Sequence, residues 1–363
     1  MISKSYILIS KKTIQIQRQI TNPVLGLNNI QFELNIHKIM KNLHLAIILL
    51  ASILLSACTS SPKTESSAGS QANGIYYWKT TFELDYAERS FLTEHNIGRL
   101  YLRLFDVVPA GNDMPYGFDF QIVPNATITF HEPIPQNVEV IPVVYITIDA
   151  LRLINNSNHD YAQLIVDRVL NMADFNDLGT IREVQLDCDW TQQTQDGYFA
   201  FCQSVKDELA QHNIQLSCTI RLWQLACACP PVDRGVLMLY NTGNITNPNT
   251  SNSILDLKDV KSYLKGKKYN LPLDFAYPTY SWYVWFRNDA FLGLFHEKPA
   301  DSLIKDGDIV RYENADFSTI MSLDSLVHQY LPTDNSSIIL YHLDSDNLSN
   351  YSTNEIHQIY SHN

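Results

Sequence analysis

The chain has 363 residues, with 38 acidic side chains against 26 basic ones and a formal net charge of −12 at pH 7. This balance argues against binding to nucleic acid and against electrostatic docking on anionic lipid, because both partners are themselves negative. The length suits one large domain, and α/β barrels commonly have this size.

The first element along the chain is a predicted signal peptide at residues 40–57. A methionine and a lysine begin it, and its apolar run at 43–55 is about 13 residues long, whereas a membrane-spanning helix needs about 20. Leu55-Ser-Ala-Cys58 resembles the bacterial lipobox, which implies that Cys58 is acylated and becomes the mature N-terminus. We therefore expect an exported protein, anchored to a bacterial membrane by lipid alone and facing the periplasm or the cell surface. The alternative is a buried apolar helix that happens to end in cysteine.

Two further segments flank this signal peptide. Residues 1–39 show neither a helical nor a strand period, and we interpret them as a mis-assigned segment upstream of the true start at Met40. The alternative is that residues 1–39 are an unusually long basic N-terminal region of the signal peptide. Residues 58–73 are small and polar, which predicts a flexible tether. Residues 1–57 carry six Lys or Arg and one Glu, so the mature chain of 363 − 57 = 306 residues has a net charge of −12 − 5 = −17.

From residue 74 to residue 363, short β-rich runs alternate with amphipathic helical patterns. Several runs are continuously apolar, as parallel strands covered by helices are. Eight such runs predict an α/β fold, a (β/α)8 TIM-type barrel. The predicted strands are Ile75–Thr81, Arg99–Phe105, Val140–Ile146, Glu183–Asp189, Gln215–Leu222, Gly235–Asn241, Leu273–Tyr277 and Ser337–Leu343. The predicted helices are Asp85–Glu94, Tyr161–Met172, Tyr198–His212, Leu255–Leu264 and Phe317–Leu331, the last stopped by Pro332.

Two connections are too long for ordinary barrel loops. Residues 107–139, after the second strand, are rich in Pro and Asn where a helix is expected, and residues 279–315 follow the seventh strand. The second connection opens with an aromatic cluster, Tyr280–Phe286. Because loops after barrel strands build the active face, we expect these two connections to lie beside the functional site.

The fourth predicted strand carries two carboxylates near its end. Alternation places Gln185, Asp187 and Asp189 on one face, and the apolar residues between them on the face toward the helices. Two acids at this spacing lie roughly 6.5–7 Å apart at Cα, close enough for one to raise the pKa of the other, which suits an acid/base pair. The alternative is a structural pair neutralised by Arg103 and Arg221.

Other strand ends add possible ligand contacts. His342 and Asp344 share a face at the end of the eighth strand, where the histidine is either a proton carrier or a hydrogen-bonded structural residue. Tyr240 and Asn241 end the sixth strand. Three tryptophans stand near carboxylates, where flat rings often stack on sugars, or else simply cover the core: Trp78, Trp190 and Trp223.

No cofactor or metal is expected. Motifs for phosphate binding, for a serine nucleophile and for a zinc-peptidase helix are missing from the sequence. Beyond Cys58 there are five cysteines, so at least one stays unpaired in an oxidising compartment. Cys188, Cys202 and Cys218 are expected to pack as small apolar residues. Cys227 and Cys229 have no accompanying ligand pair, which argues against zinc.

The fourth strand also resembles two known groups of proteins. Val184–Asp189 is similar to a strand of an uncharacterised bacterial barrel family of unknown function, and the resemblance extends to Gly74–Trp78, Leu216–Thr219 and Pro231–Gly243. It implies no activity. The two aspartates also resemble the Asp-x-Asp-x-Glu strand of chitinase-type (family 18) glycoside hydrolases. Thr191 stands where that family has its catalytic glutamate, which counts against the substrate-assisted mechanism.

These observations favour a cell-envelope lipoprotein with a glycoside-hydrolase-like barrel that acts on or binds carbohydrate. If it is hydrolytic, Asp189 is the expected acid, Asp187 tunes its pKa and Asp344 is the second carboxylate. One alternative is a non-catalytic barrel that binds glycan or supports an envelope complex. A third interpretation, a metal-dependent enzyme such as a deacetylase, would use Asp187, Asp189 and His342 as ligands. Pairing of both aspartates with arginines, without a third acid nearby, would weaken the hydrolase hypothesis.

Overall fold

The computed structural model describes residues 72–111, 119–157, 159–331 and 335–361. The predicted upstream segment, the signal peptide with Cys58, all but the end of the tether, and Pro332 lie outside these ranges. Within them, no helix is both long enough and apolar enough to cross a membrane. Residues 69–363 form one compact unit that contains the whole barrel, and we expect this part to fold by itself.

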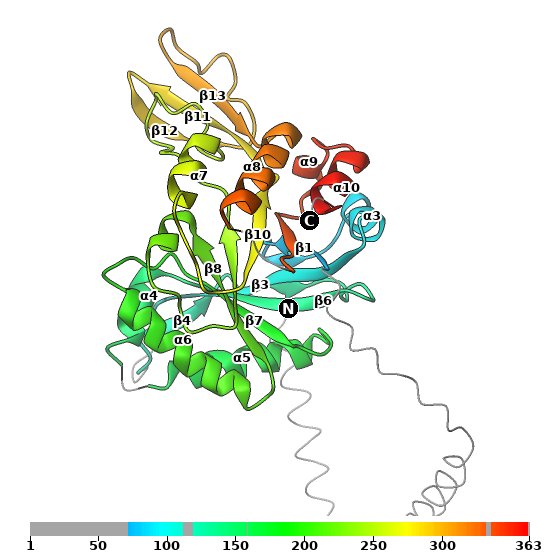
Figure 1. Ribbon diagram of the computed structural model, residues 1–363, viewed down its shortest axis with the longest axis vertical. Helices are drawn as coiled ribbons and strands as arrows, with labels where there is room; N and C mark the ends of the chain where they lie inside the picture. The colour runs from blue at the N-terminus through cyan, green and yellow to red at the C-terminus, as the bar shows by residue number, and fades with distance from the viewer. Residues whose placement is uncertain (1–71, 112–118, 158, 332–334, 362–363) are drawn as a thin grey trace, which may run out of the picture. The chain divides into compact units, whose positions relative to one another are not determined.

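Eight parallel strands close into a barrel, as predicted (Figure 1). The first barrel strand pairs in parallel with the second and also with the last, so the sheet closes on itself. The barrel strands are β1 (Asn73–Tyr77), β3 (Ile97–Pro109), β6 (Glu139–Ile146), β7 (Glu183–Asp187), β8 (Gln215–Arg221), β9 (Arg234–Met238), β10 (Leu273–Pro278) and β14 (Ile338–Tyr341).

Helices cover the outside of the barrel, and their starts follow local sequence. Asp85 caps the first of them and forms a capping box with Glu88, while aspartates at 160, 256 and 316 cap three others. The helices are α3 (Tyr86–Glu94), α4 (Ile148–Ile154), α5 (Tyr161–Phe175), α6 (Gln195–Ala210), α7 (Leu257–Leu264), α8 (Phe317–Tyr330), α9 (Ser345–Leu348) and α10 (Thr353–Ser361). After β8 there is only a short 3-10 helix, η1 (Leu222–Ala226), and the helices α4, α9 and α10 were not predicted.

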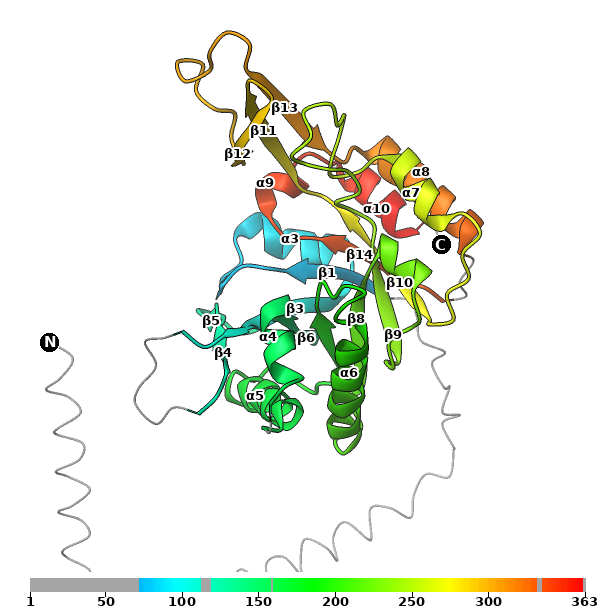
Figure 2. The ribbon, with the colours of Figure 1, turned by 90° about the vertical axis from the view of Figure 1, so that its left-hand side faces the viewer.

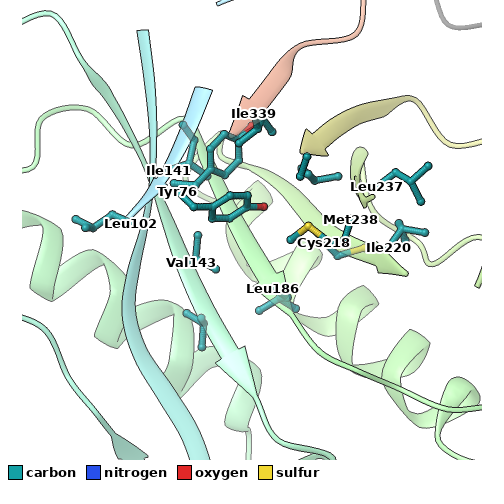
Figure 3. Packing of buried hydrophobic residues seen from close by; sticks show 14 of the residues in the cluster. Tyr76, Leu102, Ile141, Val143, Leu186, Cys218, Ile220, Leu237, Met238 and Ile339 are labelled. Atoms are coloured by element: carbon teal, nitrogen blue, oxygen red, sulfur yellow. The ribbon is translucent and has the colours of Figure 1, made fainter. Parts of the chain in front are cut away.

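Polar side chains fill much of the barrel interior. Arg234 pairs with Asp274 at 2.8 Å near the amino ends of the strands, and the Tyr76 hydroxyl donates to Gln185 Oε1 at 2.7 Å further up. The apolar residues between these positions face the helices, which is why the strands read as nearly continuous apolar runs. Figure 3 shows buried residues from several barrel strands, including Tyr76, Leu102, Val143, Leu186, Ile220 and Leu237.

The two long connections contain strands of their own. After β3, the strand β4 (Ile122–Asn125) adds antiparallel to β3, and β5 (Thr129–Phe130) pairs with β2 (Thr81–Phe82). After β10, the chain builds a separate three-stranded antiparallel sheet in the order β12-β11-β13. Its strands are β11 (Ser281–Arg287), β12 (Ala290–Phe295) and β13 (Ile309–Asn314). Both views show this sheet standing out from the barrel (Figure 1, Figure 2).

Candidate functional site

A cavity of about 370 Å³ opens at the carboxyl ends of the barrel strands. Seven of the residues predicted for the site line it: Trp78, Arg103, Asp187, Arg221, Tyr240, Asn241 and His342. Seven others were not chosen from the sequence: Tyr145, Tyr280, Ser281, Trp282, His296, Tyr341 and Asn347. Four of these, Tyr280, Ser281, Trp282 and His296, belong to the connection 279–315 that was expected beside the site, while the other three carry no sequence pattern that distinguishes them.

Asp187 is a buried carboxylate at the floor of this cavity. It is 4% exposed, accepts a 2.6 Å hydrogen bond from Thr219 Oγ1 and lies 3.4 Å from Arg221 Nη2. Burial raises the pKa of Asp187, and Arg221 and Thr219 oppose that rise. The prediction that Gln185 and Asp187 point inward is therefore confirmed.

Arg221 pairs with Asp187 at the end of β7 and with Asp189 just beyond it. Its Nε donates to Asp189 Oδ1, while its Nη2 faces Asp187. Burial lowers the pKa of Arg221, but Asp187, Tyr240 and Asp189 together outweigh this effect and raise it. Asp189 itself is half exposed and lines a second, neighbouring cavity of about 290 Å³ together with Trp223.

Arg103 does not pair with these aspartates, so that part of the alternative interpretation, a pair neutralised by Arg103 and Arg221, is wrong. It makes a two-pronged ion pair with Asp106, three residues further along β3. Its guanidinium carbon also lies 5.4 Å from the centre of the Trp78 ring, within the range of a cation–π contact. Arg103 and Trp78 thus form one wall of the cavity.

Two predicted site residues are placed elsewhere by the structure. Trp190 is fully buried and stacks on Tyr198 with ring centroids 6.0 Å apart, so it belongs to the core and not to a ligand surface. Asp344 caps α9, where its Oδ1 accepts from the backbone and side-chain nitrogens of Asn347 at 3.1 and 2.9 Å. It does not line the cavity, so the role of second carboxylate is not supported.

His342 shares the cavity with Asp187 but not with Asp189. Burial lowers the pKa of His342, although Asp344 acts in the opposite direction, so the fold favours the neutral imidazole. Among the described residues, no group of three His, Cys, Asp or Glu side chains is arranged to hold a metal ion. The metal-enzyme interpretation therefore has no supporting geometry here. The five cysteines beyond Cys58 are free thiols, and Cys188, Cys202 and Cys218 are buried as expected.

Aromatic rings form the other walls of the cavity. Tyr240 lies 5.1 Å from Tyr341 and 5.9 Å from Tyr280 between ring centroids, and Tyr341 lies 5.7 Å from Trp78. The Tyr280 hydroxyl donates to Asn241 Oδ1 at 2.8 Å, which fixes the amide at the rim. Flat apolar faces thus alternate with amide, imidazole and guanidinium groups. Such a surface suits a ligand with both apolar faces and hydroxyl groups.

Comparison with known proteins supports the fold. The sequence matches no protein-family model and no curated protein. Among solved structures, it resembles a chitinase of Chromobacterium violaceum ATCC 12472 (12% identity, 80% of this chain, 99% of that chain, TM-score 0.54). It also resembles the spore cortex-lytic enzyme SleL of Bacillus cereus (13%, 80% and 75%, TM-score 0.50). A third similar structure is the Group IV chitinase of Ostrinia furnacalis in complex with allosamidin (11%, 81% and 98%, TM-score 0.50). The chain therefore has the barrel fold of chitinase-type proteins, as the resemblance of its fourth strand implied.

Proposed function

We propose that this barrel binds carbohydrate in the cavity at the carboxyl ends of its strands. The observation that carries the proposal is the set of aromatic rings beside fixed hydrogen-bonding groups. Aromatic faces such as Trp78 and Tyr240 pack against the C–H faces of a sugar, and Asn241 and His342 offer partners for its hydroxyl groups. The names of the structural neighbours, chitinases and a spore cortex-lytic enzyme, agree with a glycan ligand.

Binding is favoured over hydrolysis because the carboxylates are wrongly disposed for cleavage. Most glycosidases work with two carboxyl groups, about 5–5.5 Å apart for retention or about 6.5–9.5 Å for inversion, whereas the substrate-assisted family 18 enzymes depend on the glutamate that ends their Asp-x-Asp-x-Glu strand. Among the described residues that line the cavity, Asp187 is the only carboxylate, and it is held by Thr219 and Arg221. Thr191 has the position of the family 18 glutamate and is not part of the lining.

Removing the Trp78 ring is expected to weaken glycan binding at least about fivefold, because a stacking contact contributes roughly 1 kcal/mol beyond its buried area. We would screen the fragment 69–363 on a glycan array and then titrate the retained glycan by calorimetry. The matched control is Phe175→Ala, which removes an aromatic ring that is 88% exposed on α5 and does not line the cavity. Retention of no glycan, or equal weakening by both substitutions, would contradict the proposal. Shorter products released from a bound glycan would show hydrolysis instead.

We also propose that Cys58 anchors the barrel to a bacterial membrane by lipid. The support is the signal-like segment 40–57 and the lipobox-like residues that end it. In a bacterial host, the wild-type chain is expected to incorporate a labelled fatty acid and to sediment with membranes, whereas Cys58→Ser should do neither. Cys227→Ser is the control, since it removes a thiol without touching the signal. Labelling that persists in Cys58→Ser would overturn this assignment.

A further inference from the structure

Exposed apolar side chains gather on the sheet that follows β10. Of eleven large apolar residues that are exposed among the described residues, seven lie on this excursion: Phe291, Leu292, Leu294, Phe295, Leu303, Ile309 and Tyr312. The strand β12 is exposed at five of its six positions although its sequence is Ala-Phe-Leu-Gly-Leu-Phe. A concentration of this kind marks an interaction surface.

The two edges of the sheet differ in how they are covered. On the β13 side, Arg311 donates to the carbonyl oxygens of Asn247 and Pro248 at 3.1 and 3.2 Å, and Asn252 Nδ2 donates to Asn314 O at 2.7 Å. A loop of the barrel thus covers that edge. On the other side, β12 forms the border of the sheet (Figure 1). Within the described part of the chain, its backbone bonds only to β11. An uncovered apolar edge strand is a template for pairing with another strand.

Both faces of β12 are apolar, and this limits the kind of partner that could bind to the strand. The pairing of β11 with β12 shifts register between Trp285 and Phe286, two neighbours that point to opposite faces of the sheet. Phe295 lies against Trp285 at 5.8 Å, and Phe291 lies against Phe286 at 5.9 Å. A flat surface such as a bilayer would cover one of these faces only. A strand added at the edge pairs with the free backbone of β12 and places its own side chains beside those on both faces.

We propose that β12 pairs with β12 of a second copy of this chain, antiparallel and across a two-fold axis, to make a continuous six-stranded sheet. Charge complementarity identifies the second copy as the occupant. Asp289 immediately precedes β12, Lys298 follows the end of β12 after His296 and Glu297, and both Asp289 and Lys298 are exposed. Antiparallel pairing brings Asp289 of each copy beside Lys298 of the other, whereas parallel pairing would place like charges together. The same register puts Leu292 of one copy opposite Phe295 of the other.

The first test is the oligomeric state of the fragment 69–363, which carries no lipid. Sedimentation velocity from about 1 to about 100 µM is expected to show a monomer that becomes a dimer as concentration rises. Leu294→Lys should stay monomeric over this range, because it places a charge in the pairing edge. Leu164→Lys is a closely matched control, since Leu164 on α5 is 44% exposed and Leu294 is 43% exposed. A wild-type monomer throughout, whether or not it binds lipid vesicles, overturns the proposal. A Leu294→Lys variant that dimerises as tightly as the Leu164→Lys control also overturns the proposal.

The second test addresses the register. Asp289→Lys and Lys298→Asp are each expected to weaken the dimer about threefold, and the double variant is expected to restore it. Lys298 also pairs with Asp301 of its own chain at 2.9 Å, so circular dichroism of each variant serves to confirm that the fold is intact. If the double variant weakens the dimer by the sum of the effects of the two single variants, the antiparallel arrangement is overturned. None of these outcomes depends on whether the barrel binds a glycan.

Discussion

Replacing Arg221 by Met is expected to lower the free energy of unfolding by about 3 kcal/mol, because it leaves a buried carboxylate without its cation. Asp187 is nearly inaccessible and keeps only the hydrogen bond from Thr219 in this variant. The half-exposed Asp189 adds little, since water solvates it once the arginine is gone. Urea denaturation of the fragment 69–363 measures the loss.

The loss of stability in Arg221→Met is expected to grow as the pH rises. The folded-state pKa of Asp187 lies above its ordinary value, so the folded chain holds this proton more tightly than the unfolded chain does. Stability therefore falls as pH rises from about 3.9 through the folded-state pKa, and removal of Arg221 raises that pKa further. The deficit of the variant is expected to be larger at pH 7 than at pH 4. The double variant with Asp187→Asn should lose this pH dependence and recover part of the stability. A deficit of equal size at both pH values would contradict the assignment of Asp187 as its cause.

Replacing Trp190 by Ala is expected to cost about 3–5 kcal/mol of stability, the usual range for a large buried aromatic side chain. The indole is 0% exposed and touches Tyr198, Phe199 and Trp223. Such a loss is a large part of the total stability of an ordinary domain. The denaturant midpoint of Trp190→Ala should therefore move far more than that of Trp223→Ala, whose ring is only partly buried.

Equal shifts for the two tryptophan variants would contradict the core assignment of Trp190. If Trp190→Ala lost glycan binding but kept its stability, Trp190 would have to be assigned to the ligand site instead. The comparison is informative because both rings follow barrel strands, and the sequence offered no reason to separate them.

The barrel itself was predictable because its signals are local and repeated. Each of the eight parallel strands overlaps a predicted apolar run, and α3 begins at the expected aspartate, Asp85. The missed elements are those whose signals are short or irregular. The four-residue helix α9 is less than two turns long, and the strands β11, β12 and β13 lie in a connection where we expected an aromatic cluster but no strands.

The site was predictable only in part. Alternation along the fourth strand correctly placed Gln185 and Asp187 inside, because the two-residue period of a strand needs no tertiary information. The same rule did not show that Asp344 would turn away to cap a helix, or that Trp190 would be covered by α6. Those residues lie just beyond strand ends, where the strand period no longer applies.

What the sequence determined by itself is therefore the alternation of strands with helices and the inward direction of strand residues, since both depend on near neighbours in the chain. Only the tertiary structure decided which charges meet. Parallel pairing of β7 with β8 brings Arg221 to both Asp187 and Asp189 across more than 30 residues, while Arg103 pairs with Asp106 on its own strand. The strength of an ion pair falls with the distance between the two charged groups, and the arrangement of the strands around the barrel sets that distance.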